Sequence, residues 1–474
     1  MKLALLGSPG RKPISNGEYN ELANRLYHIQ LEASGLEDGN VLLVMRAMTL
    51  QQAWYQQGDV QRALSMFRQS VLLNGADDFY SKEFRRRTGL SLDSYYLITM
   101  YLLTMVQRYS TDIVEVNLFV VLYHLTPSIS AADIYCYFRL TSVRLQELPD
   151  FIEKFRLEDD YQSEYFQETP FRHRPFILNG DQILAFSSDV CAMGLSYLVP
   201  TLLKREVQGY KGRFGDEFER YVGRILGGAG LDIWTEKQLE AFYKSKGLKG
   251  KLVDFVIFGD DDTVLLVECK AVEPSDVVKA SATPEVLKRD LEGSFCKAIR
   301  QGVEVAVRLA STPEFKGKRF RQIVITHEEF FIPDARFVVE NIDHDLLGDL
   351  IGTHSTLAMS IDEILYARID DIEDLMKAHT EGLVDMWSLL ERILLAQRLT
   401  GTTVMLFRNH LQGALNGVSR GDTPITDEMK RYLQVIEEVF RKNKLAWRGK
   451  EQRLMGTANA VLVNLHNYFN HNPM

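Results

Sequence analysis

The chain has 474 residues, of which 46% are hydrophobic and 25% charged, a composition typical of a globular protein with two or three domains. Its formal net charge of −9 excludes a uniformly basic surface, so any nucleic acid would have to be bound by local basic patches. The four cysteines lack CxxC spacing, which excludes a disulfide framework or a zinc finger and favours a cytoplasmic location.

Residues 1–203 predict a helical domain that ends in a short β-hairpin. Apolar residues recur at spacings of three and four, and the segment from Ala53 to Asn74 predicts a helical hairpin, with a single repeat unit of the tetratricopeptide kind as the alternative. The apolar block Tyr95–Val106 is too short to span a bilayer, so a buried helix and no membrane association are expected. Two short strands flank Asn179-Gly180-Asp181, a strong hairpin signal.

Residues 204–343 predict an α/β domain with a mixed sheet. The expected order is a helix over 214–226, a strand over 231–236, a lysine-rich connection, a hairpin over 253–271, a helix over 286–309 and a strand over 320–327. Residues 344–474 are predicted to be helical. The expected fold class is therefore a multidomain protein whose α/β core is flanked by mostly α-helical regions, which suit protein partners or self-association.

The predicted hairpin VDFVIFGDDDTVLLVECKA carries charges where a buried strand is expected. Side chains alternate along a strand, so Glu268 and Lys270 share one face. If Gly259 pairs with Thr263 around a three-residue loop, Asp254 lies opposite Glu268 on that face. Strands ~4.8 Å apart would let both carboxylates reach one divalent cation. The alternative is a solvated sheet end with a weak surface ion pair.

A helix with acidic residues precedes this hairpin. In KGRFGDEFERYVGRILGGAG, Glu219 lies at the edge of the apolar stripe, with Glu217 as the second choice. The glutamate in a first helix, the aspartate and the Glu-x-Lys motif resemble the PD-(D/E)xK nuclease superfamily, in particular Mrr-type restriction endonucleases and archaeal Holliday-junction resolvases. The resemblance covers residues 211–327, and Val253 replaces the proline of the motif.

The resemblance implies a restriction-endonuclease-like core and a metal-dependent reaction. Asp254, Glu268 and the backbone carbonyl of Cys269 would hold Mg²⁺, for which Mn²⁺ is expected to substitute. Glu219 would complete the outer coordination or hold a second metal ion. Lys270 would orient the attacking water or stabilise the charge that develops on the phosphate.

Further candidate residues surround this motif. A glutamine on the helix after the hairpin lies near the active site in Mrr-like relatives, which points to Gln301; a solvent-facing glutamine is the alternative. Two basic runs are predicted to contact nucleic-acid phosphates. The candidates are Lys244, Lys246, Lys249, Lys251, Lys318, Arg319 and Arg321.

The expected function is thus that of a Mg²⁺-dependent endonuclease acting on DNA. Nuclease cores fused to large helical regions resemble those of prokaryotic restriction and anti-phage defence systems, which makes defence the expected setting. Two alternatives stay open. One is a catalytically inactive nuclease-like module that binds nucleic acid or other proteins, and the other is an RNA-directed nuclease.

Overall fold

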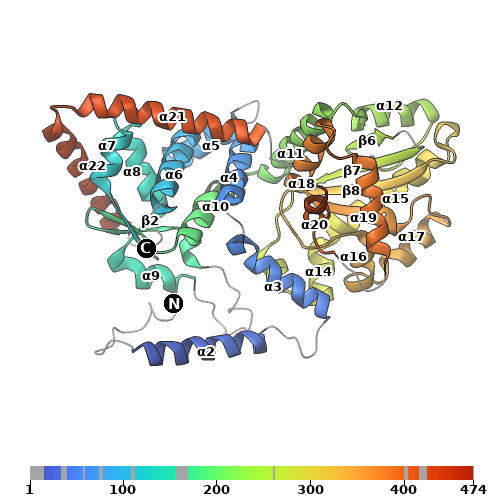
Figure 1. Cartoon of the computed structure of the whole chain (residues 1–474), viewed down its shortest axis with the longest axis horizontal. Coiled ribbons are helices and arrows are strands. Elements are labelled where there is room, and N and C mark those ends of the chain that lie inside the picture. The colour runs from blue at the N-terminus through green and yellow to red at the C-terminus, as the bar shows by residue number, and fades with distance from the viewer. Residues whose placement is uncertain are drawn as a thin grey trace. The chain divides into compact units, whose positions relative to one another are not determined.

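The computed structural model describes residues 15–33, 40–56, 59–73, 78–107, 113–155, 169–259, 262–399, 404–415 and 424–472. The described residues form two compact units, whose elements are labelled in Figure 1. The first unit takes in residues 1–27, 54–210 and 424–474, and the second takes in residues 28–53 and 211–423. The sequence predicted three consecutive domains, whereas these units are each assembled from separate stretches of the chain.

The first unit contains a four-stranded mixed sheet in addition to helices. Its strands are β1 (Val114–Asn117), β2 (Ser142–Arg144), β3 (Phe176–Asn179) and β4 (Gln182–Ala185), in the order β1-β4-β3-β2. The predicted hairpin is confirmed, because Asn179 pairs with Gln182 around a turn in which Gly180 has a φ of 63°. Strands β1 and β2 were missed, since three or four residues are too few to establish an alternating pattern.

Helices from both ends of the chain build the rest of the first unit. They are α4 (Asp59–Leu73), α5 (Phe79–Thr88), α6 (Leu92–Gln107), α7 (Leu118–Leu125), α8 (Ala131–Thr141), α9 (Leu148–Glu153), α10 (Ser188–Glu206), α21 (Pro424–Trp447) and α22 (Glu451–His471). Helix α21 packs against α4, α6 and α7, and α22 packs against α7 and α8 (Figure 1). The block Tyr95–Val106 lies in α6 with Tyr95 and Tyr96 fully buried, as predicted.

The helical hairpin predicted over residues 53–74 takes in only the end of the preceding helix, together with α4. Helix α3 (Val41–Gln56) lies largely in the second unit and α4 in the first. Leu43 of α3 is fully buried in the core of the second unit, and the Arg46 guanidinium donates to the carbonyl of Val278 there at 2.9 Å. Most of α3 therefore belongs to a different unit from α4, although the two helices are adjacent in sequence. The first described helix is α2 (Asn16–Ala33).

The second unit is built on a five-stranded sheet. Its strands are β5 (Asp232–Thr235), β6 (Phe255–Phe258), β7 (Thr263–Lys270), β8 (Arg319–Thr326) and β9 (Ile364–Arg368), in sequential order. Strands β5, β6 and β7 are antiparallel, and β7, β8 and β9 are parallel. The mixed sheet is confirmed. Strand β9 lies in the region predicted to be helical, because a short apolar run without flanking turn signals resembles a helix segment.

Helices cover both faces of this sheet (Figure 1). They are α11 (Tyr210–Gly228), α12 (Glu236–Lys246), α13 (Asp276–Ala280), α14 (Pro284–Leu291), α15 (Lys297–Ala310), α16 (Ala335–Asn341), α17 (Leu346–His354), α18 (Ile369–Thr380), α19 (Met386–Arg398) and α20 (Phe407–Ala414). The lysine-rich connection is thus partly helical, and a π-helical turn over Glu292–Cys296 interrupts the helix predicted at 286–309.

Two glycines set how closely the helices approach the sheet. A Cβ on Gly302 of α15 would lie 2.0 Å from Oε1 of Gln322 on β8, and a Cβ on Gly223 of α11 would lie 3.1 Å from the Phe255 ring. The side chains that face α15 include Val264 and Leu266 of β7. Because strand side chains alternate, α15 covers the face that carries Glu268 and Lys270, and α11 covers the opposite face.

Candidate active site

The β6–β7 hairpin adopts the register expected from a three-residue loop. Phe255 pairs with Val267 and Phe258 with Val264, and the Gly259 N–H donates to the Thr263 carbonyl at 2.9 Å. Residues 260 and 261 of the loop lie outside the described part of the chain. This register places Asp254 opposite Glu268.

Asp254 is fixed by the backbone of β7. Its Oδ2 accepts a hydrogen bond from the Cys269 N–H at 2.6 Å. In an antiparallel ladder the N–H and C=O of one residue point toward the same neighbouring strand, so the Cys269 carbonyl points to the side where Asp254 lies. Carboxylate and carbonyl oxygens therefore meet just before β6 begins.

Glu268 is held from two sides. Its Oε1 accepts from the Lys270 Nζ at 2.5 Å, and the two side chains are 4% and 13% exposed, respectively. Its Oε2 accepts from the Gln301 amide at 2.9 Å, and the same amide also donates to the Leu252 carbonyl. Gln301 thus lies against the candidate site rather than facing solvent.

The structure distinguishes between the two glutamates of α11. Glu217 forms an ion pair with Arg220 at 2.7 Å. Glu219 is half-buried, and the charge of Asp254 acts on it. Glu219 is therefore the helix acid associated with the cluster, although α11 covers the other face of the sheet and Glu219 must reach Asp254 around the sheet end.

Burial and mutual repulsion make these acids difficult to ionise. Burial, followed by the charge of Glu268, raises the pKa of Asp254 to about 7, and the Cys269 N–H and Lys270 oppose this shift. Burial, followed by Asp254 and Glu236, raises the pKa of Glu219 to about 7. Burial also raises the pKa of Glu268, against the effect of Lys270. Such repulsion is relieved when a cation binds between the carboxylates.

The donor atoms fit a hard divalent cation in kind, because Asp254, Glu268 and the Cys269 carbonyl offer oxygen, which Mg²⁺ and Mn²⁺ prefer. Their spacing fits less closely. The described Glu219, Asp254 and Glu268 are not a group of three donors within 4.8 Å of one another. Glu219 approaches from the opposite face, so a position in an outer shell suits it better than a place beside the other two carboxylates.

A different group of described residues meets the 4.8 Å spacing, namely Glu292, Cys296 and Asp343. Cations of the chain already lie against it: Lys288 is 2.7 Å from Asp343, and Arg300 is 2.5 Å from Glu292. Burial and the nearby carboxylates raise the pKa of the Cys296 thiol to about 12. A metal ion here would have to displace Lys288 and remove the thiol proton, so this cluster fits a cation poorly.

The side chains predicted to contact nucleic acid differ in their exposure and in their ion pairs. Lys249 and Lys251 are exposed. Lys244 pairs with Glu240, Lys246 with Glu314 and Lys318 with Asp262. Arg319 is half-exposed and lies 3.8 Å from Glu391.

The assignment of Arg321 to nucleic-acid binding is corrected. Its side chain is 4% exposed and forms ion pairs with Glu363, at 3.2 Å, and with Glu391. A guanidinium enclosed by two carboxylates has no surface to offer to a phosphate, so Arg321 is part of the interior of the second unit.

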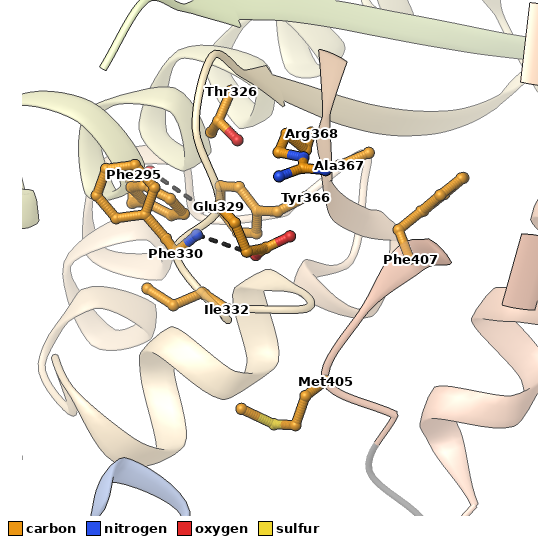
Figure 2. Close-up of a pocket in the computed structure, with 10 residues that line it drawn as sticks. All are labelled: Phe295, Thr326, Glu329, Phe330, Ile332, Tyr366, Ala367, Arg368, Met405 and Phe407. Carbon is orange, nitrogen blue, oxygen red and sulfur yellow. Dashed lines mark hydrogen bonds between the residues drawn. The ribbon is translucent and has the colours of Figure 1, made fainter. Parts of the chain in front are cut away.

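Figure 2 shows a pocket of the second unit, which the strand register places on the face of the sheet that carries Glu268 and Lys270. Lys270 pairs with Thr326, and Thr326 pairs with Arg368, so these three side chains form a row across β7, β8 and β9. Thr326 and Arg368 line the pocket with Glu329, which accepts from the Phe330 N–H at 2.9 Å. Arg368 forms an ion pair with Asp370. The positive charge of Arg368 in this pocket is therefore neutralised by an acid of the same chain.

Sequence reasoning missed two charged residues near the acids. Glu236 at the start of α12 raises the pKa of Glu219, and Lys297 at the start of α15 opposes the rise at Glu268. The spacing of Lys297 and Gln301, four residues apart on one predicted helix, was the available signal, since such residues share a helix face.

No helix in the described part of the chain combines the length and the apolar character needed to cross a bilayer. Comparison with known proteins finds no relative: no family model, no curated protein and no solved structure matches the chain.

Proposed function

We propose that this chain is a metal-dependent nuclease with a restriction-endonuclease-like core, which hydrolyses phosphodiester bonds in DNA. The observation that carries the proposal is the β6–β7 register, which sets Asp254 opposite Glu268 with Lys270 on the same face. Buried acids that repel one another beside an ammonium are costly for a purely structural site. Their cost is understandable where a cation and a phosphate bind.

Each residue has a role that follows from its contacts. Asp254, Glu268 and the Cys269 carbonyl would hold Mg²⁺ or Mn²⁺, and Glu219 would act in the outer shell. A bound divalent cation supplies Lewis acidity and a bound water with a lowered pKa. Lys270 would orient that water or stabilise charge on the phosphate.

Gln301 would keep Glu268 in position through its 2.9 Å hydrogen bond. The exposed Lys249 and Lys251 precede Asp254 in sequence and would contact substrate phosphates, as phosphate contacts contribute most of nonspecific DNA affinity. We propose a prokaryotic restriction or anti-phage defence system as the setting. The helical first unit would bind other proteins there.

Plasmid nicking tests the proposal. The purified full chain is incubated with supercoiled plasmid and Mg²⁺ or Mn²⁺, beside Lys270→Ala and the matched control Asp334→Asn, which alters a buried acid outside the site. Wild type and Asp334→Asn should nick the plasmid, and Lys270→Ala should be slower by about 10²-fold or more. Undiminished cleavage by Lys270→Ala overturns the site assignment.

Two parallel substrates separate the alternatives. Cleavage of labelled tRNA but not of plasmid or single-stranded DNA would replace DNA with RNA as the substrate. Binding of DNA in Ca²⁺ without cleavage in Mg²⁺ or Mn²⁺ would identify an inactive binding module and overturn the nuclease proposal.

A further inference from the structure

One face of α15 overlies the candidate site. Gln301 of this helix contacts Glu268 at 2.9 Å, and Lys297 lies four residues earlier, one helical turn away on the same face. The buried stripe of α15, which includes Ala298, Ile299 and Val303, orients the helix on the sheet and so fixes where this face points.

Lys297 differs from the other cations in this part of the chain. Lys288 forms an ion pair with Asp343, and Arg300 forms one with Glu292. Lys297 is exposed, and within the described residues no hydrogen bond or ion pair involves its ammonium group. Its one-turn spacing from Gln301, whose amide contacts Glu268, places Lys297 on the face of α15 that adjoins the site.

Two lysines thus belong to the elements that hold Glu268. Lys270 of β7 contacts Oε1, and Lys297 lies on α15 one turn before Gln301, which contacts Oε2. Lys270 is 13% exposed and its ammonium is engaged by Glu268, whereas Lys297 is open to solvent. A polyanionic strand that approached the acids from the α15 side would meet Lys297 first.

We propose that Lys297 binds a backbone phosphate of the nucleic-acid strand next to the scissile phosphate, and so guides the strand onto the acids. This inference rests on the proposed nuclease function and adds a phosphate-binding residue to it. A lysine is suited to this role because its ammonium acts as a flexible point charge on phosphate.

The test is the salt dependence of DNA binding. The affinity of a labelled duplex for the full chain is measured by fluorescence anisotropy in Ca²⁺, across about 50–200 mM salt. Lys297→Ala is compared with wild type, with Lys297→Arg and with the control Lys154→Ala, an exposed lysine of the first unit. Alanine is a good helix former, and circular dichroism verifies that each variant is folded.

Loss of one phosphate contact reduces the slope of log affinity against log salt by about 0.9. Lys297→Ala should show this reduction and weaker binding at low salt, Lys297→Arg should restore most of the slope, and Lys154→Ala should match wild type. Single-turnover cleavage in Mg²⁺ should slow in Lys297→Ala at subsaturating enzyme and recover at saturation.

The outcomes separate the two proposals. Wild type that neither binds nor cleaves nucleic acid overturns the nuclease function itself. Wild type that cleaves, with an unchanged salt slope in Lys297→Ala, overturns the role of Lys297 alone. A changed pH profile of cleavage with an unchanged slope also overturns that role, because it identifies Lys297 as a partner of Glu268.

Discussion

Replacement of Asp254 with asparagine is expected to stabilise the second unit at alkaline pH while it removes a proposed metal ligand. Asparagine keeps an oxygen that can accept the Cys269 N–H, which donates to Asp254 at 2.6 Å, but it carries no charge. Burial and the charge of Glu268 raise the pKa of Asp254 from 3.8 to about 7. The native state therefore favours the protonated carboxyl group.

The size of the effect follows from this shift. Below pH 3.8 the native and unfolded chains both hold the proton, and the stabilisation by protonated Asp254 is fully present. As the pH rises toward about 7, the unfolded chain releases a proton that the native state retains, so the stability of the wild type falls. A shift of about three pKa units corresponds to about 4 kcal/mol. Relaxation of neighbouring groups reduces this value, so Asp254→Asn should be more stable than wild type by about 2–4 kcal/mol at pH 8 and by little near pH 4.

Hydrogen exchange of the β6 and β7 amides, followed by mass spectrometry in the presence of a chelator, measures this difference locally. The matched control is Asp334→Asn. Burial raises the pKa of Asp334 to about 6, and its carboxylate accepts from the Phe337 N–H at 2.7 Å, away from the acid cluster. Mg²⁺ at 100 times its Kd should stabilise wild type and the control by about 2.7 kcal/mol, and Asp254→Asn by much less.

Two results would refute this reasoning. Equal protection of the amides from exchange in wild type and Asp254→Asn at pH 8 would show that burial and Glu268 do not destabilise the ionised Asp254 carboxylate. Stabilisation by Mg²⁺ that persists undiminished in Asp254→Asn would show that this residue is not a ligand.

Three further predictions concern neighbouring groups. Gln301→Ala removes the amide that holds Glu268. We expect a loss of about 1–3 kcal/mol in unfolding free energy, measured by urea unfolding, and slower nicking in the plasmid assay. Unchanged values in both assays would show that Gln301 is not part of the site. Arg321→Ala removes a buried guanidinium but leaves Glu363 paired with Arg398 and Glu391 near Arg319. We therefore expect a loss of about 1–3 kcal/mol in unfolding free energy, while the folded fraction binds DNA with wild-type affinity in anisotropy titrations. Normal stability with weakened DNA binding would instead assign Arg321 to the binding surface. The pKa values of Asp254 and Glu219, both raised to about 7, predict that Mg²⁺ affinity, measured by calorimetry, rises with pH up to about 7 because protons compete with the metal ion; an affinity independent of pH between about 5 and 8 would contradict this.

Local rules of chain geometry were sufficient for the centre of the candidate site. Alternation along β7 places Glu268 and Lys270 on one face, and the length of the loop between Gly259 and Thr263 sets the register that brings Asp254 to the same level. These relations depend on neighbours in one hairpin. They could therefore be derived before any long-range contact was known.

The sequence by itself determined this hairpin and the Asn179-Gly180-Asp181 turn, because each is encoded by alternation and turn chemistry within about 20 residues. The tertiary structure decided what surrounds them. It buried Arg321 between Glu363 and Glu391, although the same basic run exposes Arg319, because charge in a sequence does not indicate which acids fold over it. Likewise α3 packs mainly in the second unit, whereas the next helix in sequence, α4, belongs to the first. Burial of an apolar helix face depends on which complementary surface is available.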